Sequence, residues 1–115
     1  MQPCINLWIE HAGEVVLSDW RVNLLEAIAE TGSISSAATR MSVPYHRAWD
    51  KIHEMEQGLD VKLVEAQVGG VGGGGAHLTP QGQDYVEKFR RFEAGFKELI
   101  EQRFKEIFKP DLKRE

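Results

Sequence analysis

The sequence predicts a mainly α-helical domain with small β-elements, and two observations carry this prediction. Residues 32–58 place a glycine stop, a serine-rich helix start, a short break and a second amphipathic helix in succession. A run of seven residues with six glycines follows at 69–75, with extended segments on both sides. A two-helix corner followed by a two-stranded hairpin is the order of a winged helix-turn-helix.

The helix-turn-helix is predicted from the residues at its corners. Gly32 suits the left-handed conformation that ends a helix, and Ser33 or Ser35 can cap the next one through its hydroxyl. Val43 is an apolar residue within the following turn, and Pro44 is preset for a first helical position. One helix therefore ends near residue 31, and two more follow before residue 58.

The other elements follow from alternation and helical periodicity. Apolar residues alternate with polar ones at the N-terminus and resume after a turn at 11–13, which predicts an added β-hairpin. Thr79 and Pro80 form a strong helix start. We expect a single domain over 1–115, made of a hairpin (5–17), a three-helix core with the helix-turn-helix (18–58), a glycine-rich wing (61–78) and a long dimerisation helix (79–108).

The second helix of the motif is the predicted reader of DNA. Ala48, Ile52 and Met55 recur at the spacing of a buried stripe, so the opposite face is free to enter a groove. The planar fork of Arg47 suits a bidentate contact to guanine, whereas Lys51 suits a phosphate. The glycine-rich tip presents backbone amides to a phosphate backbone or a minor groove. The predicted contacts to double-stranded DNA are Ser33, Ser35, Ser36, Tyr45, His46, Arg47, Asp50, Lys51, Gly72, Gly73 and Gly74.

The net charge of −4 argues against DNA, because nucleic-acid binders usually carry a basic surface. The DNA prediction therefore requires the acidic residues to lie away from the start of the reading helix. The alternative is a winged-helix protein-interaction module, in which Asp50 and Glu54 on the exposed helix would suit a basic partner.

A homodimer is predicted from the last helix and from the first. The helix that starts at Thr79 runs to about Phe108, roughly 45 Å, which is longer than a domain of this size can cover alone. The first helix has a second apolar face as well. Packing across a two-fold axis would cover both surfaces. The predicted dimerisation residues are Val22, Leu25, Phe89, Phe92, Phe96, Leu99, Ile100 and Phe104.

Other chemistries find little support in the sequence, and we expect neither an enzyme nor a cofactor. Residues 70–75 match the dinucleotide pattern G-x-G-x-x-G, but residues 76–78 look extended where that pattern needs a helix, and no parallel strand is expected after them. His46, Asp50 and His53 share a helix face without a fourth ligand, so no metal site is expected. The single Cys4 is given no role. With neither a leader nor a spanning segment, we expect a cytoplasmic protein without membrane contact.

These segments together resemble the N-terminal DNA-binding domain of ModE-type molybdate-responsive regulators, which is related to the LysR-type winged helix. The combination of Ala-Trp-Asp in the reading helix with the glycine wing and the following Leu-Thr is the specific part of this resemblance. The similar segments are LLEAI (24–28), TGSIS (31–35), SVPY (42–45), AWDKI (48–52), EM (54–55), GGVGGGGAHLT (69–79) and Gly82.

The resemblance implies a dimeric transcriptional regulator in which Tyr45, His46 and Arg47 face DNA. Regulators of this type carry C-terminal molybdate-binding modules, and we expect no such module within residues 1–115. The resemblance therefore leaves two sources for the signal, a stand-alone domain controlled from elsewhere or a separate sensor protein. The operator, the sign of regulation and the effector do not follow from the sequence.

Overall fold

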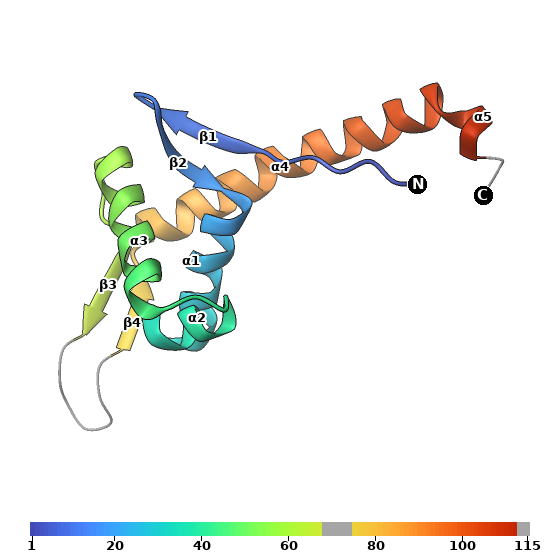
Figure 1. The fold of residues 1–115 in the computed structure, drawn as a ribbon. Coiled ribbons are helices and arrows are strands. Elements are labelled where there is room, and N and C mark those ends of the chain that lie inside the picture. Colours follow the sequence, from blue (N-terminus) through green and yellow to red (C-terminus); the bar gives the residue numbers. More distant parts are fainter. Residues whose placement is uncertain (68–74, 113–115) are drawn as a thin grey trace.

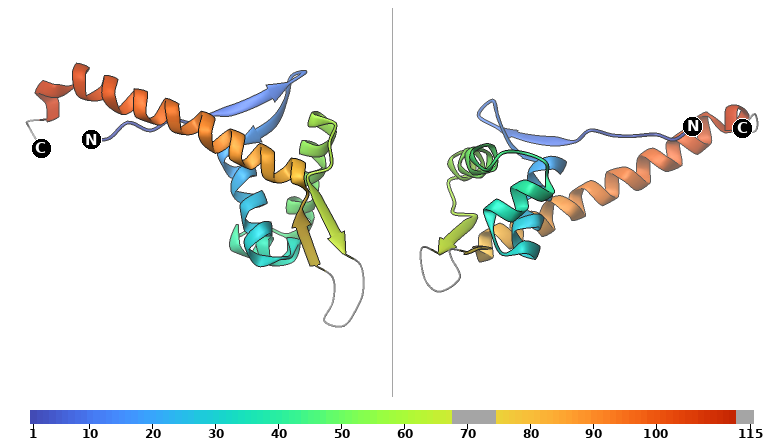
Figure 2. Two further views of the ribbon diagram at one scale, coloured as in Figure 1. Left: turned by 180° about the vertical axis from the view of Figure 1, so that it is seen from behind. Right: turned by 60° about the horizontal axis from the view of Figure 1, so that its bottom comes forward.

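The computed structural model describes residues 1–67 and 75–112 and shows a small helical body from which one long helix projects (Figures 1 and 2). The described chain measures 61 × 31 × 21 Å. The prediction of a mainly α-helical fold with two small hairpins is confirmed. The elements are β1 (Trp8–His11), β2 (Glu14–Ser18), α1 (Asp19–Thr31), α2 (Ile34–Arg40), α3 (Tyr45–Leu59), β3 (Val64–Gln67), β4 (Gly75–Leu78), α4 (Pro80–Ile107) and α5 (Lys109–Leu112).

Helix α1 and helix α2 are delimited by side-chain and glycine caps, as predicted. The Ser18 hydroxyl accepts a hydrogen bond from the Arg21 N–H at 3.1 Å and starts α1. Gly32, at φ 75°, ends α1 in the left-handed conformation. Ser33 rather than Ser35 then caps α2, because its hydroxyl accepts from the Ser36 N–H at 2.8 Å.

The turn between α2 and α3 is short and tied to the end of α2. Ser42 takes a positive φ of 59°, and the Val43 N–H donates to the Ala38 carbonyl at 3.0 Å. Val43 packs against the core as the predicted apolar residue of the turn. Pro44 has ψ 151°, so it lies just before the helix instead of at its first position, and α3 begins at Tyr45.

The N-terminal hairpin is shorter than predicted and begins at Trp8 instead of Ile5. A two-residue loop of Ala12 and Gly13, with φ of 53° and 82°, joins β1 to β2. Two consecutive positive φ values give the tight turn that matches the twist of antiparallel strands.

The wing strands also begin later than predicted, at Val64 instead of Val61. The Glu56 carboxylate of α3 accepts from the Leu63 N–H at 2.8 Å and the Val64 N–H at 3.2 Å, so this part of the backbone bonds to α3 before it pairs as a strand. Strand β3 then pairs antiparallel with β4. The predicted DNA contacts Gly72, Gly73 and Gly74 lie outside the described residues.

The core lies where α1, α2, α3, the wing and the start of α4 meet. Val22 and Leu25 are 0% exposed and Phe89 is 1% exposed, all within one chain. The prediction that these three residues form a dimer interface is therefore wrong. Helix α1 is apolar on two sides because α4 and β4 cover it on one side while α2 and α3 cover it on another.

Arg90 of α4 makes four side-chain hydrogen bonds, three of them to residues of α1. Arg90 donates to Asp19 at 2.7 Å, to Asn23 and Glu26 at 2.5 Å each, and to Glu93 at 3.1 Å. The hydrogen bond from Arg90 lowers the pKa of Asp19, and the surrounding carboxylates raise the pKa of Arg90 despite its partial burial. Beyond this point α4 leaves the body, as Figures 1 and 2 show.

Gly82→Ala is expected to destabilise the fold more than Gly58→Ala. A Cβ at Gly82 would lie 2.3 Å from the backbone carbonyl oxygen of Leu63, whereas a Cβ at Gly58 would meet the Val16 side chain at 2.4 Å. The Val16 side chain, although buried, has more freedom to shift than backbone, whereas the Leu63 backbone is held by the Thr79 N–H at 2.9 Å. We expect Gly82→Ala to lower the free energy of unfolding by about 3 kcal/mol or more in urea titrations. Equal losses for the two variants would contradict this packing.

Candidate nucleic-acid interface

The start of α3 presents a polar face to solvent. Tyr45, His46, Arg47 and Asp50 are all exposed. On the other side of the helix, the predicted stripe of Ala48, Ile52 and Met55 is buried. The described structure therefore gathers four of the predicted DNA contacts on one accessible surface, within the first two turns of the helix.

Of the serines at the start of α2, one caps the helix and two are exposed to solvent. The Ser33 hydroxyl is occupied by the helix cap and its residue is half-buried. Ser35 and Ser36 are exposed. The cap takes up the Ser36 N–H, so the hydroxyl groups of Ser35 and Ser36 are the accessible groups for phosphate oxygens.

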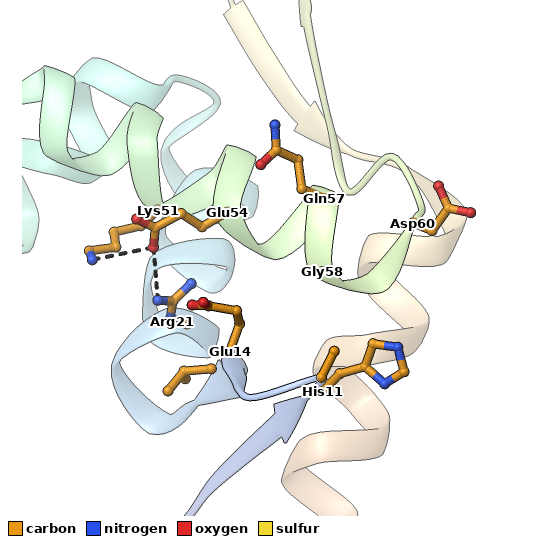
Figure 3. Close-up of a pocket in the computed structure, with 10 residues that line it drawn as sticks. His11, Glu14, Arg21, Lys51, Glu54, Gln57, Gly58 and Asp60 are labelled. Atoms are coloured by element: carbon orange, nitrogen blue, oxygen red, sulfur yellow. Dashed lines mark hydrogen bonds and ion pairs between the residues drawn. The ribbon is translucent and has the colours of Figure 1, made fainter.

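An ion-pair network joins the middle of α3 to α1 (Figure 3). The Glu54 carboxylate accepts from Arg21 of α1 at 2.9 Å and from Lys51 at 3.3 Å. Partial burial alone would raise the pKa of Glu54, but the hydrogen bonds from both cations outweigh it and lower that pKa. Lys51, predicted as a phosphate contact, therefore already has a partner on its own helix.

A hollow of about 740 Å³ lies beside this network, between the β1–β2 turn and α3 (Figure 3). His11 and Glu14 line it from the hairpin, and Gln57 and Asp60 line it from the end of α3. The Nη1 atom of Arg21 is buried there and has no hydrogen-bond acceptor among the described residues. Sequence reasoning missed this place because Arg21 and Glu54 are 33 positions apart and no local motif links them.

The side of α3 that lies away from Arg21 carries Trp49, His53 and Glu56. We call it the wing-facing flank. Glu56 bonds to the backbone that enters β3, and His53 lines a shallow hollow together with Val61 and Lys62. The Trp49 indole stacks on the His53 ring with 3.6 Å between centroids and 26° between planes. Neither Trp49 nor His53 was among the predicted DNA contacts.

Internal interactions occupy many of the acidic groups. Glu54 pairs with Arg21, Glu56 bonds to backbone, Glu65 pairs with His77, and the Arg90 network holds three further carboxylates. Among residues 1–67 and 75–112, no ion pair involves Arg47. The net charge of −4 is thus spread over the body, and Asp50 is the carboxylate on the exposed start of α3.

Two other kinds of site find no support in the part of the chain that the structure describes. Its histidine, cysteine and acidic side chains form no group of three that could hold a metal ion. Its helices include none with both the length and the apolar character needed to cross a membrane.

A capped two-helix corner, an exposed reading helix and a two-stranded wing define a winged helix-turn-helix domain of the class found in transcription regulators. The model of the bacterial regulatory helix-turn-helix proteins of the lysR family matches residues 21–83, more than half of the chain. The chain belongs to this family.

Curated relatives confirm the resemblance to molybdenum-responsive regulators. The molybdenum-pterin-binding protein MopB of Rhodobacter capsulatus is 44% identical over 80 residues, 70% of this chain and 30% of that protein. The DNA-binding transcriptional dual regulator ModE of Escherichia coli K12 is 40% identical over 89 residues, 77% of this chain and 34% of that protein. The chain spans about a third of the length of these relatives.

Solved structures with the same fold include a complex with DNA. The CbnR DNA-binding domain bound to DNA superimposes with a TM-score of 0.52 at 27% identity, over 64% of this chain and 79% of that one. CbnR itself, a LysR family transcriptional regulator, gives a TM-score of 0.56 at 26% identity, over 73% of this chain and 28% of that one.

Proposed function

We propose that this protein binds a specific sequence in double-stranded DNA as a homodimer and thereby regulates transcription. The observation that carries the proposal is the exposed start of α3, where Arg47 has no ion-pair partner among the described residues, beside the wing of a lysR-family fold. Arg47 donates to guanine O6 and N7 in the major groove, and Tyr45, His46 and Asp50 contact neighbouring base edges.

The phosphate contacts follow from the accessible groups around this helix. Ser35 and Ser36 lie exposed at the start of α2, and their hydroxyl groups are the proposed phosphate contacts. The wing glycines supply further backbone amides in the proposal. Because few cations take part, binding by one chain is weak, and a dimer with two reading helices compensates for this.

The homodimer is supported by the outer part of α4. After Arg90, the helix carries an apolar stripe that the described chain does not cover, with Phe92 45% exposed and Phe96 and Leu99 also exposed. Ile100 and Phe104 are half-buried on the same stretch. A stripe of this size is unusual on a monomer, and a two-fold axis along it places the same surface of a second copy against it.

The structure favours DNA over the protein-interaction alternative on one point. That alternative needs Asp50 and Glu54 to attract a basic partner, but Glu54 is already bound by Arg21 and Lys51. One free carboxylate on α3 is a weak basis for recognising a basic protein.

By analogy with relatives named for molybdenum, we place the regulated genes in metal or oxyanion uptake. A separate sensor protein is one route for the signal in this proposal. Co-purification of this chain with such a sensor from its source cell, dependent on molybdate, is the observation that tests this route.

Arg47→Ala is expected to weaken binding to the specific duplex by about 1–3 kcal/mol, because the bidentate contact to one base is lost. Fluorescence anisotropy at one fixed salt concentration measures the change. The matched control is Arg91→Ala, which removes the same charge from an exposed position on α4.

Equal effects of the two substitutions would contradict base reading by Arg47. They would reduce its role to general attraction between charges. Loss of discrimination between the specific site and a scrambled duplex, seen with Arg47→Ala alone, is the expected pattern.

A further inference from the structure

We propose that Trp49 reads thymine in the bound DNA, by packing its indole against the 5-methyl group of the base. This inference rests on the proposed DNA-binding function and adds a sequence-reading residue to it. The methyl group of thymine projects into the major groove and distinguishes thymine from cytosine through apolar contact.

The first observation is the exposure of a large aromatic surface on the reading helix. Trp49 lies one helical turn after Tyr45 on the same flank, and the two are 43% and 53% exposed. Trp49 is not a member of the core cluster, and its ring contact among the described aromatic residues is with His53. An apolar partner that arrives from outside the chain would remove this surface from water.

The second observation is that the indole is held in place. The His53 ring stacks on one face of it, and the His53 Nδ1 atom lies 2.7 Å from the Trp49 carbonyl oxygen. His53 is therefore fixed to the helix backbone and backs the indole from one side. A side chain that is ordered before binding loses less conformational entropy when it makes a contact.

The third observation is the side of α3 on which Trp49 lies. Trp49 and His53 belong to the wing-facing flank, since Glu56 on that flank bonds to the backbone entering β3. With α3 in the major groove and the wing at the neighbouring backbone or groove, this flank faces the DNA strand that runs between them. Thymines of either strand project their methyl groups into the major groove, so in this proposal the indole meets a methyl from this flank while Arg47, on the other flank, reads elsewhere.

The size of the effect follows from the area of one methyl group. Removing one buried methyl costs about fourfold in affinity, and a two-fold symmetric site contains two such contacts, or about 15-fold together. An effect of this size is well within the range of a binding titration.

The test uses the full chain and its selected DNA site. Each thymine is replaced in turn by deoxyuridine, symmetrically in both half-sites, which removes only the methyl group. Wild-type protein is expected to lose about 15-fold at one thymine position, and Trp49→Ala is expected to bind both duplexes equally. The matched control is Trp8→Ala, an exposed tryptophan on β1 that should keep the full sensitivity.

Three results would overturn the inference. These are uniform tolerance of deoxyuridine by the wild type, the same sensitivity in Trp49→Ala, or loss of sensitivity in Trp8→Ala as well. Trp49→Phe, which keeps an aromatic ring, is a second variant for which partial sensitivity is expected. If the wild type selects no DNA at all, the proposed function fails instead, and the two failures are thereby distinguished.

Discussion

Replacing Phe89 by alanine is expected to lower the free energy of unfolding by about 3–5 kcal/mol, the range for removing a buried aromatic side chain. Phe89 is 1% exposed and belongs to the core at the junction of α4 and the body. Domains of this size have only about 5–15 kcal/mol in total, so the variant should be close to unfolding in mild denaturant. Urea titration followed by circular dichroism measures the loss.

Phe92→Ala provides the matched comparison, three residues further along the same helix. Phe92 is 45% exposed, so its truncation should change stability by about 0.5 kcal/mol or less in dilute solution. At higher protein concentration the difference from wild type should grow, because wild type is then stabilised by dimerisation. A loss at Phe92 equal to that at Phe89 in dilute protein would contradict the division between core and exposed stripe.

Replacing Phe96 by aspartate is expected to weaken the homodimer at least 100-fold, or about 3 kcal/mol. Phe96 lies in the exposed stripe of α4 and meets Phe92 edge-to-face, with 4.9 Å between ring centroids. A carboxylate there would have to be buried without a partner when two copies associate. Sedimentation equilibrium measures the dissociation constant.

The control for this experiment is Glu98→Ala, because Glu98 lies on the opposite side of α4 by helical geometry. Phe96→Asp should also lose affinity for a symmetric site while keeping affinity for a single half-site. An unchanged dimer in Phe96→Asp would show that α4 does not form the interface, whatever the DNA result.

The helix boundaries and the reading helix could be predicted from the sequence because their causes are local. Ser18, Gly32, Ser33 and Thr79 act through hydrogen bonds or φ angles within a few residues. The buried stripe of α3 follows from its 3.6-residue period in the same way. The strand starts were predicted less well, since Glu56 draws the backbone before β3 onto α3 through a contact that spans seven residues.

Periodicity could not predict which apolar residues are buried within one chain and which remain exposed. A helix with two apolar faces has the same sequence pattern whether its second face packs against another element of the same chain or against a second copy. Val22 and Leu25 proved to be covered by the same chain, whereas Phe92 and Phe96 remain exposed. Their difference depends on where α4 crosses α1, a contact to which Arg90 contributes by hydrogen bonds to residues more than 60 positions away.

The exposure of the start of α3 could be predicted from the sequence, whereas the contacts around it could not. Arg47, His46 and Asp50 follow from their place at the start of α3. The attachment of Glu54 to Arg21 and the stacking of Trp49 on His53 required coordinates, although the i, i+4 spacing of an aromatic pair was a usable signal for the latter.

Selection from a randomised duplex pool, with the mass of the bound complex determined in the same sample, tests the central claim most directly. We predict enrichment of a two-fold symmetric site whose half-sites lie about one DNA turn apart, bound by two copies of the chain, with affinity that falls as salt is raised. An intact dimer that enriches no sequence even at low salt would contradict the claim and favour a protein-interaction module.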